Sequence, residues 1–116
     1  RNGRDRLRAA MHDYAIVMTQ DYCRCVSRIA DSELGPDSRA RFRKLKREID
    51  LMLRDLVQAG IADGSLRPGD PRLITFTLTG ALNWIGRWYE PGGSMTPEHI
   101  ASYLVGTLLQ GIETAP

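Results

Sequence analysis

Apolar side chains recur every three or four residues along most of this 116-residue chain, a spacing that places them on one face of an α-helix. The first such stretch covers about residues 5–31. Its apolar positions are Leu7, Met11, Tyr14, Ala15, Met18, Tyr22, Val26 and Ile29. This pattern predicts one long helix or two in close succession. A bend is expected near Thr19–Asp21, because threonine, glutamine and aspartate in series weaken helical preference.

A break is predicted at residues 32–38. Gly35 can take the left-handed conformation that ends a helix, and Pro36 cannot continue one. Asp37 or Ser38 then offers a side-chain oxygen to the free amides of the next helix.

That next helix is expected over about residues 39–62. The apolar stripe that it is expected to bury consists of Phe42, Leu45, Ile49, Met52, Leu53 and Leu56. The following turn contains Gly64, which is expected to cap the C-terminal end of the helix.

Proline near the first helical position marks the last two predicted helices. Asp70-Pro71 opens one that runs to about Tyr89, and Thr96-Pro97 opens another that runs to about Gly111. Both helices are apolar over more than one face, so they must be covered on more than one side. We expect them to form a helical hairpin, and two hairpins related by a two-fold axis would form a four-helix dimer interface. The residues expected at this interface are Thr77, Gly80, Ala81, Trp84, Ile100, Leu104 and Leu108. The alternative is that the hairpin forms the centre of a monomeric core.

The composition fits one all-α domain over residues 1–116. Apolar residues make up 42% and charged residues 26%, as is usual for a globular protein, and the net charge of +2 is too small to indicate nucleic-acid or membrane binding by itself. No uncharged apolar run is long enough to span a bilayer. We therefore expect a cytoplasmic helical bundle without a membrane partner.

Candidate catalytic and metal-binding residues are few. His12 and His99 lie near opposite ends of the chain, and no serine or cysteine motif accompanies them. Cys23 and Cys25 are two apart, so in a helix their side chains point to different sides. We expect one thiol to be buried and the other peripheral. The sequence predicts no enzyme, no metal site and no cofactor.

The stretch from Asn83 to Gly93 (NWIGRWYEPGG), followed by Thr96-Pro97-Glu98, resembles the C-terminal region of TetR/AcrR-family bacterial regulators. It is especially similar to the branch that responds to acyl-CoA or steroid-degradation intermediates. Residues 59–66 with Asp70-Pro71 resemble the turn between that family's long middle helix and its dimerisation helices. The resemblance covers nearly the whole chain.

The resemblance implies a homodimeric transcriptional repressor with an N-terminal helix-turn-helix domain. The chain begins at Arg1 and contains no such motif, so we expect part of a longer protein that contacts operator DNA only through that missing domain. The implied role of residues 1–116 is to bind a small apolar effector and to dimerise. The expected pocket is lined by Met11, Tyr14, Met18, Met52, Leu56, Phe76, Asn83 and Trp88, with Tyr14 and Asn83 as its hydrogen-bonding groups. The alternative is that these residues form a solid core.

A basic run occupies residues 39–47: Arg39, Arg41, Arg43, Lys44, Lys46 and Arg47. Such a run is usually a solvated helix face. A second interpretation places Arg43 and Arg47 at a pocket mouth, where they contact the phosphates of a coenzyme A ester. A third makes the chain a helical interaction module whose basic helix contacts nucleic acid directly, although nearby acidic residues dilute the charge.

Overall fold

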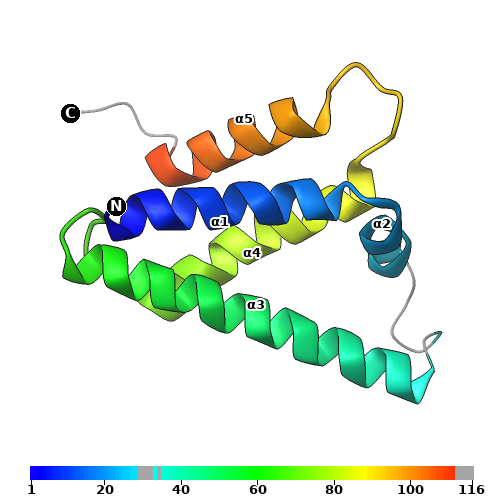
Figure 1. Ribbon diagram of the computed structural model, residues 1–116, viewed down its shortest axis with the longest axis horizontal. Coiled ribbons are helices and arrows are strands. Elements are labelled where there is room, and N and C mark those ends of the chain that lie inside the picture. Colours follow the sequence, from blue (N-terminus) through cyan, green and yellow to red (C-terminus); the bar gives the residue numbers. More distant parts are fainter. Residues whose placement is uncertain (29–32, 34, 112–116) are drawn as a thin grey trace.

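The computed structural model describes residues 1–28, 33 and 35–111, and this part of the chain folds into five α-helices (Figure 1). Their bounds are α1 (Gly3–Met18), α2 (Asp21–Arg28), α3 (Pro36–Ala62), α4 (Pro71–Trp88) and α5 (Pro97–Gln110). No strand occurs in the described residues. The predicted all-α class is confirmed.

The bend predicted near Thr19–Asp21 separates α1 from α2. The backbone N–H of Thr19 donates to the carbonyl of Ile16 at 3.0 Å, and its hydroxyl donates to the same oxygen at 2.6 Å. This hydroxyl bond is the local competition with helical bonding that makes threonine a weak helix former. The end of the predicted stretch, including Ile29, lies outside the described residues.

The start of α3 differs from the prediction. Gly35 has φ −63° and ψ 155°, which is extended rather than left-handed, and Pro36 is the first residue of the helix. Asp37 lies inside the first turn, so neither it nor Ser38 is the N-cap. Proline suits this position because its fixed φ is already helical and its missing N–H would have no helical partner.

The remaining helix ends follow the predicted signals. Gly64, just after α3, has φ +81°, the left-handed conformation expected of a glycine cap. The Asp70 side chain accepts from the backbone N–H of Arg72 at 2.9 Å, and the Thr96 side chain accepts from that of His99 at 3.1 Å. Both caps precede a proline, as predicted.

Helix α1 lies at the centre of the bundle and packs against α3, α4 and α5 (Figure 1). Its residues Leu7, Met11 and Ala15 are fully buried among side chains of the other helices. Helix α5 packs chiefly against α1, not against α4, so α4 and α5 do not form the close hairpin expected from the sequence. The apolar face of α1 provides the surface on which α5 is buried instead.

The buried stripe predicted for α3 is realised only in its C-terminal half. The buried residues of this helix are Leu53, Val57 and Gly60, whereas Leu45 and Met52 are nearly half exposed. Phe42, Ile49 and Leu56 are intermediate. In Figure 1 the N-terminal part of α3 diverges from α1, which explains why the stripe is incompletely covered.

The α3–α4 turn caps the start of α1. The backbone N–H of Gly3 donates to the Asp63 carboxylate at 2.7 Å, and that of Arg4 donates to the Ser65 hydroxyl at 3.0 Å. Hydrogen bonds from the Ser65 side chain and from the backbone of Gly3 and Ser65 lower the pKa of Asp63. A Cβ at Gly3 would lie 2.3 Å from the backbone nitrogen of Gly60, so this close crossing of α1 and α3 requires glycine.

Candidate functional site

The two polar residues predicted to anchor a ligand contact each other across the helix bundle. The Tyr14 hydroxyl on α1 donates a hydrogen bond to the side-chain oxygen of Asn83 on α4. Both side chains are half-buried. Within the described residues, no bond is found for the amide N–H groups of Asn83, so these donors are available to another molecule.

The surroundings of this pair are mainly apolar. Met11 and Met18 lie on α1 with Tyr14 and are buried. Burial and, to a smaller extent, the nearby Cys23 thiol raise the pKa of Tyr14 to about 12. Burial also raises the pKa of Cys23. Tyr14 is therefore a neutral donor at physiological pH, and Cys23 is a protonated thiol.

Helix α2 is held against the end of α4 by two arginines. Arg28 donates to the carbonyl oxygens of Tyr89 at 3.1 Å and Arg87 at 3.3 Å. Arg24 donates to the Tyr89 carbonyl at 3.3 Å, and its guanidinium lies 5.8 Å from the centre of the Tyr89 ring. These donors satisfy carbonyl groups that the end of a helix leaves without partners. They keep α2, and with it Cys23, beside Tyr14 and Asn83.

The other predicted pocket residues are more dispersed. Leu56 packs partly against the core, whereas Met52 is 47% exposed on α3. Phe76 is 45% exposed, and its ring centre lies 5.9 Å from the guanidinium of Arg54 and 5.4 Å from that of Arg72. Trp88 ends α4 and is partly exposed. The structure brings together Tyr14 and Asn83, with Met11 and Met18 on the same helix as Tyr14, but leaves Met52, Phe76 and Trp88 partly open to solvent.

The basic run lies on the exposed first half of α3. Arg43 and Arg47 are both exposed. A different face of the same half-helix forms a groove of about 320 Å³ with α2. The residues that line this groove are Tyr22, Arg41, Phe42, Lys44, Leu45 and Glu48. Sequence reasoning missed Tyr22 as a site residue, since only the tertiary arrangement places it opposite α3.

Three of the seven predicted interface residues are exposed, and all three lie on α4: Thr77, Gly80 and Trp84. We define the outer face of α4 as Leu73, Thr77, Gly80, Ala81, Trp84 and Trp88. Leu73 is 61% exposed and Trp84 is 58% exposed. Gly80 has no atom within 4 Å of where a Cβ would stand. This face combines large apolar side chains with an open, small residue at its centre.

The predicted interface residues of α5 are placed differently. Ile100 is only 3% exposed and belongs to the core of the chain, and Leu104 and Leu108 pack partly against that core. The exposed side of α5 instead carries His99 and Tyr103, whose ring centres are 6.2 Å apart. The periodicity could not distinguish these two sides of α5, because both carry apolar or aromatic residues.

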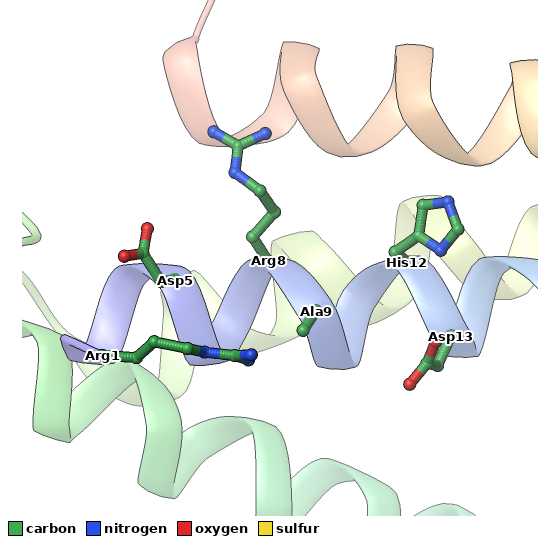
Figure 2. Close-up of a pocket in the computed structure, with 6 residues that line it drawn as sticks. All are labelled: Arg1, Asp5, Arg8, Ala9, His12 and Asp13. Atoms are coloured by element: carbon green, nitrogen blue, oxygen red, sulfur yellow. The ribbon is translucent and has the colours of Figure 1, made fainter.

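A shallow surface on α1 carries a mixture of charges. It is lined by Arg1, Asp5, Arg8, Ala9, His12 and Asp13. Figure 2 shows Arg8 extending from α1 toward α5, and Asp13 on the opposite side of α1. His12 Nε2 lies 2.8 Å from a carboxylate oxygen of Glu98 and so joins α1 to the start of α5. The opposite charges lie along one helix and converge on no common point, so this surface offers no built binding site.

The remaining candidate chemistry is sparse. Cys23 is half-buried and Cys25 is exposed, and both are free thiols. Across residues 1–28, 33 and 35–111, no group of three histidine, cysteine or acidic side chains is arranged to hold a metal ion. In the same part of the chain, no helix is both long and apolar enough to cross a bilayer.

Comparison with known proteins identifies the family to which the chain belongs. Residues 1–112 match the model of the tetracyclin repressor-like C-terminal domain. The chain is 34% identical over 59 residues to the HTH-type transcriptional repressor KstR2 of Mycolicibacterium smegmatis, covering 50% of the chain and 29% of that protein. It is 30% identical over 70 residues to KstR2 of Rhodococcus jostii, covering 60% of the chain and 34% of that protein. The chain thus spans about a third of the length of these relatives.

A solved structure supports the same assignment. The crystal structure of a TetR/AcrR-family transcriptional regulator from Thermobifida fusca superposes with a TM-score of 0.83 at 25% identity, covering 98% of the chain and 61% of that protein. This likeness extends over all five helices, and the family match covers the chain from its first residue to the end of α5. The chain therefore belongs to the tetracyclin repressor-like C-terminal domain family.

Proposed function

We propose that this domain senses a small apolar effector and dimerises, and that effector binding modulates DNA binding by a separate helix-turn-helix domain of the same protein. The observation that carries the proposal is the hydrogen bond between Tyr14 and Asn83. It joins the central helix α1 to α4, whose outer face is apolar and uncovered. A ligand that replaces or reinforces this bond changes the packing of the helix that presents the dimerisation surface.

The proposed effector has an apolar body and at least one hydrogen-bonding group. Methionine side chains adapt to varied apolar shapes, and Met11 and Met18 lie on the same helix as Tyr14. The free amide donors of Asn83 favour a ligand with an acceptor oxygen. The resemblance to the acyl-CoA and steroid-responsive branch is consistent with this chemistry.

The proposed dimer uses the outer face of α4. Single exposed apolar residues are common on protein surfaces, but contiguous patches mark interaction sites. Leu73, Trp84 and Trp88 form such a patch around Gly80, which permits close approach of a second helix. The same face on a second copy forms a self-complementary contact about a two-fold axis.

Coupling between effector and DNA follows from linkage. An effector that binds one arrangement of α1 and α4 more tightly shifts the dimer toward the geometry of that arrangement. If operator DNA prefers the other geometry, the effector weakens DNA binding, and DNA weakens effector binding by the same factor. For repressors with helix-turn-helix domains, the separation of the two recognition helices must match the spacing of the half-sites. A shift within the dimer therefore changes operator affinity.

Sedimentation equilibrium of this chain, with and without fatty acids and acyl-CoA esters, tests the proposal. We expect a dimer whose thermal midpoint rises with one of these ligand classes, because a ligand that binds only the folded state stabilises it. Asn83→Leu should reduce that rise, and Gln58→Leu on the exposed side of α3 should preserve it. A monomer that responds to none of the ligands would contradict both parts of the proposal.

The proposed effector class can be narrowed with two arginines. If Arg43 and Arg47 contact coenzyme A phosphates, Arg43→Glu with Arg47→Glu should weaken acyl-CoA binding while leaving the affinity for the free acid unchanged. The matched control is Arg1→Glu with Arg8→Glu, which makes the same charge change at the N-terminal end of the chain, away from residues 39–47 of α3. Equal loss of both ligands would count against the phosphate contact.

A second candidate function is direct nucleic-acid binding by the exposed basic half of α3. It is favoured by the exposure of Arg41, Arg43, Lys44, Lys46 and Arg47 on a segment that diverges from α1 (Figure 1). Binding to unrelated DNA that falls steeply with salt would support it. Salt-insensitive binding of an apolar small molecule would support the sensor instead.

A further inference from the structure

A cleft of about 690 Å³ lies between the start of α4 and the end of α5. It exists because α5 packs on α1 instead of closing against α4. Leu7 of α1 contributes to the cleft, and the α3–α4 turn closes one end through Ser65, Leu66 and Arg67. Neither Tyr14 nor Asn83 lines it, so it is separate from the site proposed for the effector.

Just over half of the residues that line the cleft are aliphatic. Six of its lining residues are leucine or isoleucine: Leu7, Leu66, Ile74, Leu78, Leu108 and Leu109. Its volume lies within the range of roughly 300–1,000 Å³ that is usual for small-molecule sites, which are mainly apolar with a few polar groups. These walls suit an unbranched hydrocarbon chain.

Two guanidinium groups supply the polar end. Arg4 and Arg67 both line the cleft, and neither side chain has an ion-pair or hydrogen-bond partner among the described residues. None of the described residues that line the cleft is acidic. The nearby Asp63 already accepts from the backbone of Gly3 and Ser65. An anionic group in the cleft would therefore meet two guanidinium groups that have no partner among the described residues.

We propose that this cleft binds an amphipathic anion, with its alkyl chain against the leucine walls and its head group between Arg4 and Arg67. Arginine suits a carboxylate or phosphate head because its planar donors match two oxygens at once. This proposal does not depend on the function proposed for Tyr14 and Asn83.

The charges of the chain argue against a second copy as the occupant. Helix α4, which carries the proposed dimer face, contains Arg72 and Arg87 and no acidic residue. A copy that approached through α4 would bring further positive charge toward Arg4 and Arg67. Ile74 and Leu78 also lie on a side of α4 that is turned by about a quarter circle from the outer face.

Calorimetric titration of the chain with decanoate tests the proposal, with decan-1-ol and decyltrimethylammonium as neutral and cationic ligands of the same chain length. We expect decanoate to bind more tightly than either. Arg4→Gln with Arg67→Gln should weaken decanoate binding by about tenfold or more, since two charge-assisted hydrogen bonds are lost, and should not change the affinity for decan-1-ol. Decyl phosphate is titrated alongside, and the tighter anion identifies the preferred head group.

The matched control is Arg41→Gln with Lys44→Gln, which removes two positive charges from the α2–α3 groove and should leave decanoate binding unchanged. Asn83→Leu should also leave it unchanged, which separates this site from the effector site. Methyl NMR shifts on decanoate addition should centre on Leu78 and Leu108. Equal binding of the three decyl ligands, equal loss in the control, or binding that disappears as the chain dimerises would overturn the proposal.

Discussion

The two faces of α4 differ in what covers them, although both are rich in apolar residues. On the inner face, Leu82 and Ile85 are fully buried by α1, α2 and α3. On the outer face, Leu73 and Trp84 are 61% and 58% exposed. The pattern of apolar residues predicts that α4 must be covered on several sides, but the described residues leave its outer face exposed. Apolar character alone therefore does not distinguish a core from an interface.

The threonines of α4 show that both faces avoid unsatisfied polar groups. Thr75 is fully buried, yet its hydroxyl donates to the carbonyl of Pro71 at 2.7 Å. On the outer face, the Thr77 hydroxyl donates to the Leu73 carbonyl at 2.9 Å. Because each hydroxyl bonds to its own helix, neither requires water or another chain. Both faces can be buried without the cost of an unpaired donor.

Among the substitutions proposed for α4, Leu82→Ala should have the largest effect on the free energy of unfolding. Leu82 is fully buried, so its truncation leaves a cavity and should lower the free energy of unfolding by about 3 kcal/mol. Urea denaturation of the chain measures this change. Leu73→Ala on the outer face, measured at a protein concentration where the chain is monomeric, should cost less than about 1 kcal/mol. Similar losses in the two variants would remove the distinction between the faces.

Trp84→Ala should weaken dimerisation. A large aromatic side chain at the centre of an interface typically contributes about 2 kcal/mol, so the dimer dissociation constant should rise by about 30-fold. Sedimentation equilibrium provides the measurement. Tyr103→Ala, which removes an even more exposed aromatic side chain from α5, is the control and should change the constant little. An unchanged constant for Trp84→Ala would place the dimer interface elsewhere.

Alkaline pH should weaken the contact that joins α1 to the inner side of α4. The pKa of Tyr14 is raised from 10.0 to about 12, so between these values the unfolded chain loses the proton while the folded chain keeps it. The contribution of Tyr14 to stability is therefore complete below pH 10 and declines as pH rises toward 12, by up to about 3 kcal/mol. Other groups also titrate in this range, so the difference between the native chain and Tyr14→Phe is the quantity to measure. A difference that does not change with pH would show that Tyr14 ionises normally.

Gly80→Ala should have the smallest effect. It should stabilise the folded monomer and weaken the dimer. No atom of the chain would contact the added methyl group, and alanine favours the helix over glycine by about 1 kcal/mol. Thermal unfolding of the monomer should therefore shift upward. If a second helix approaches closely at Gly80, the same substitution should weaken the dimer. Gly106→Ala on α5, where the added Cβ also meets no atom within 4 Å, tests whether any weakening is specific to α4.

Local signals predicted much of the secondary structure. Asp70 and Thr96 cap the last two helices, and Gly64 adopts the left-handed conformation, as expected from residue type and position. The start of α3 was misplaced because proline can either follow a finished helix or begin a new one. The sequence contains no local signal that decides between these two roles.

The candidate site was predicted in part. Tyr14 and Asn83 were selected as polar residues on apolar helices, and the structure joins them by a hydrogen bond across 69 positions of the chain. Met52 and Phe76 were selected by the same reasoning but lie largely at the surface. Helical periodicity indicates which residues share a face, but it does not indicate which face meets a neighbouring helix.

The sequence by itself determined the approximate extent of the described helices, most of their caps and the membership of the TetR family, but it left open whether residues 5–31 form one helix or two. These depend on interactions within a few residues of the chain, or on a pattern preserved along it. Only the tertiary structure decided that α5 packs against α1, that Ile100 belongs to the core, and that a cleft with two arginines opens between α4 and α5. Burial of an apolar face is favourable against any complementary surface. Which helix covers which face therefore depends on how all the helices pack together.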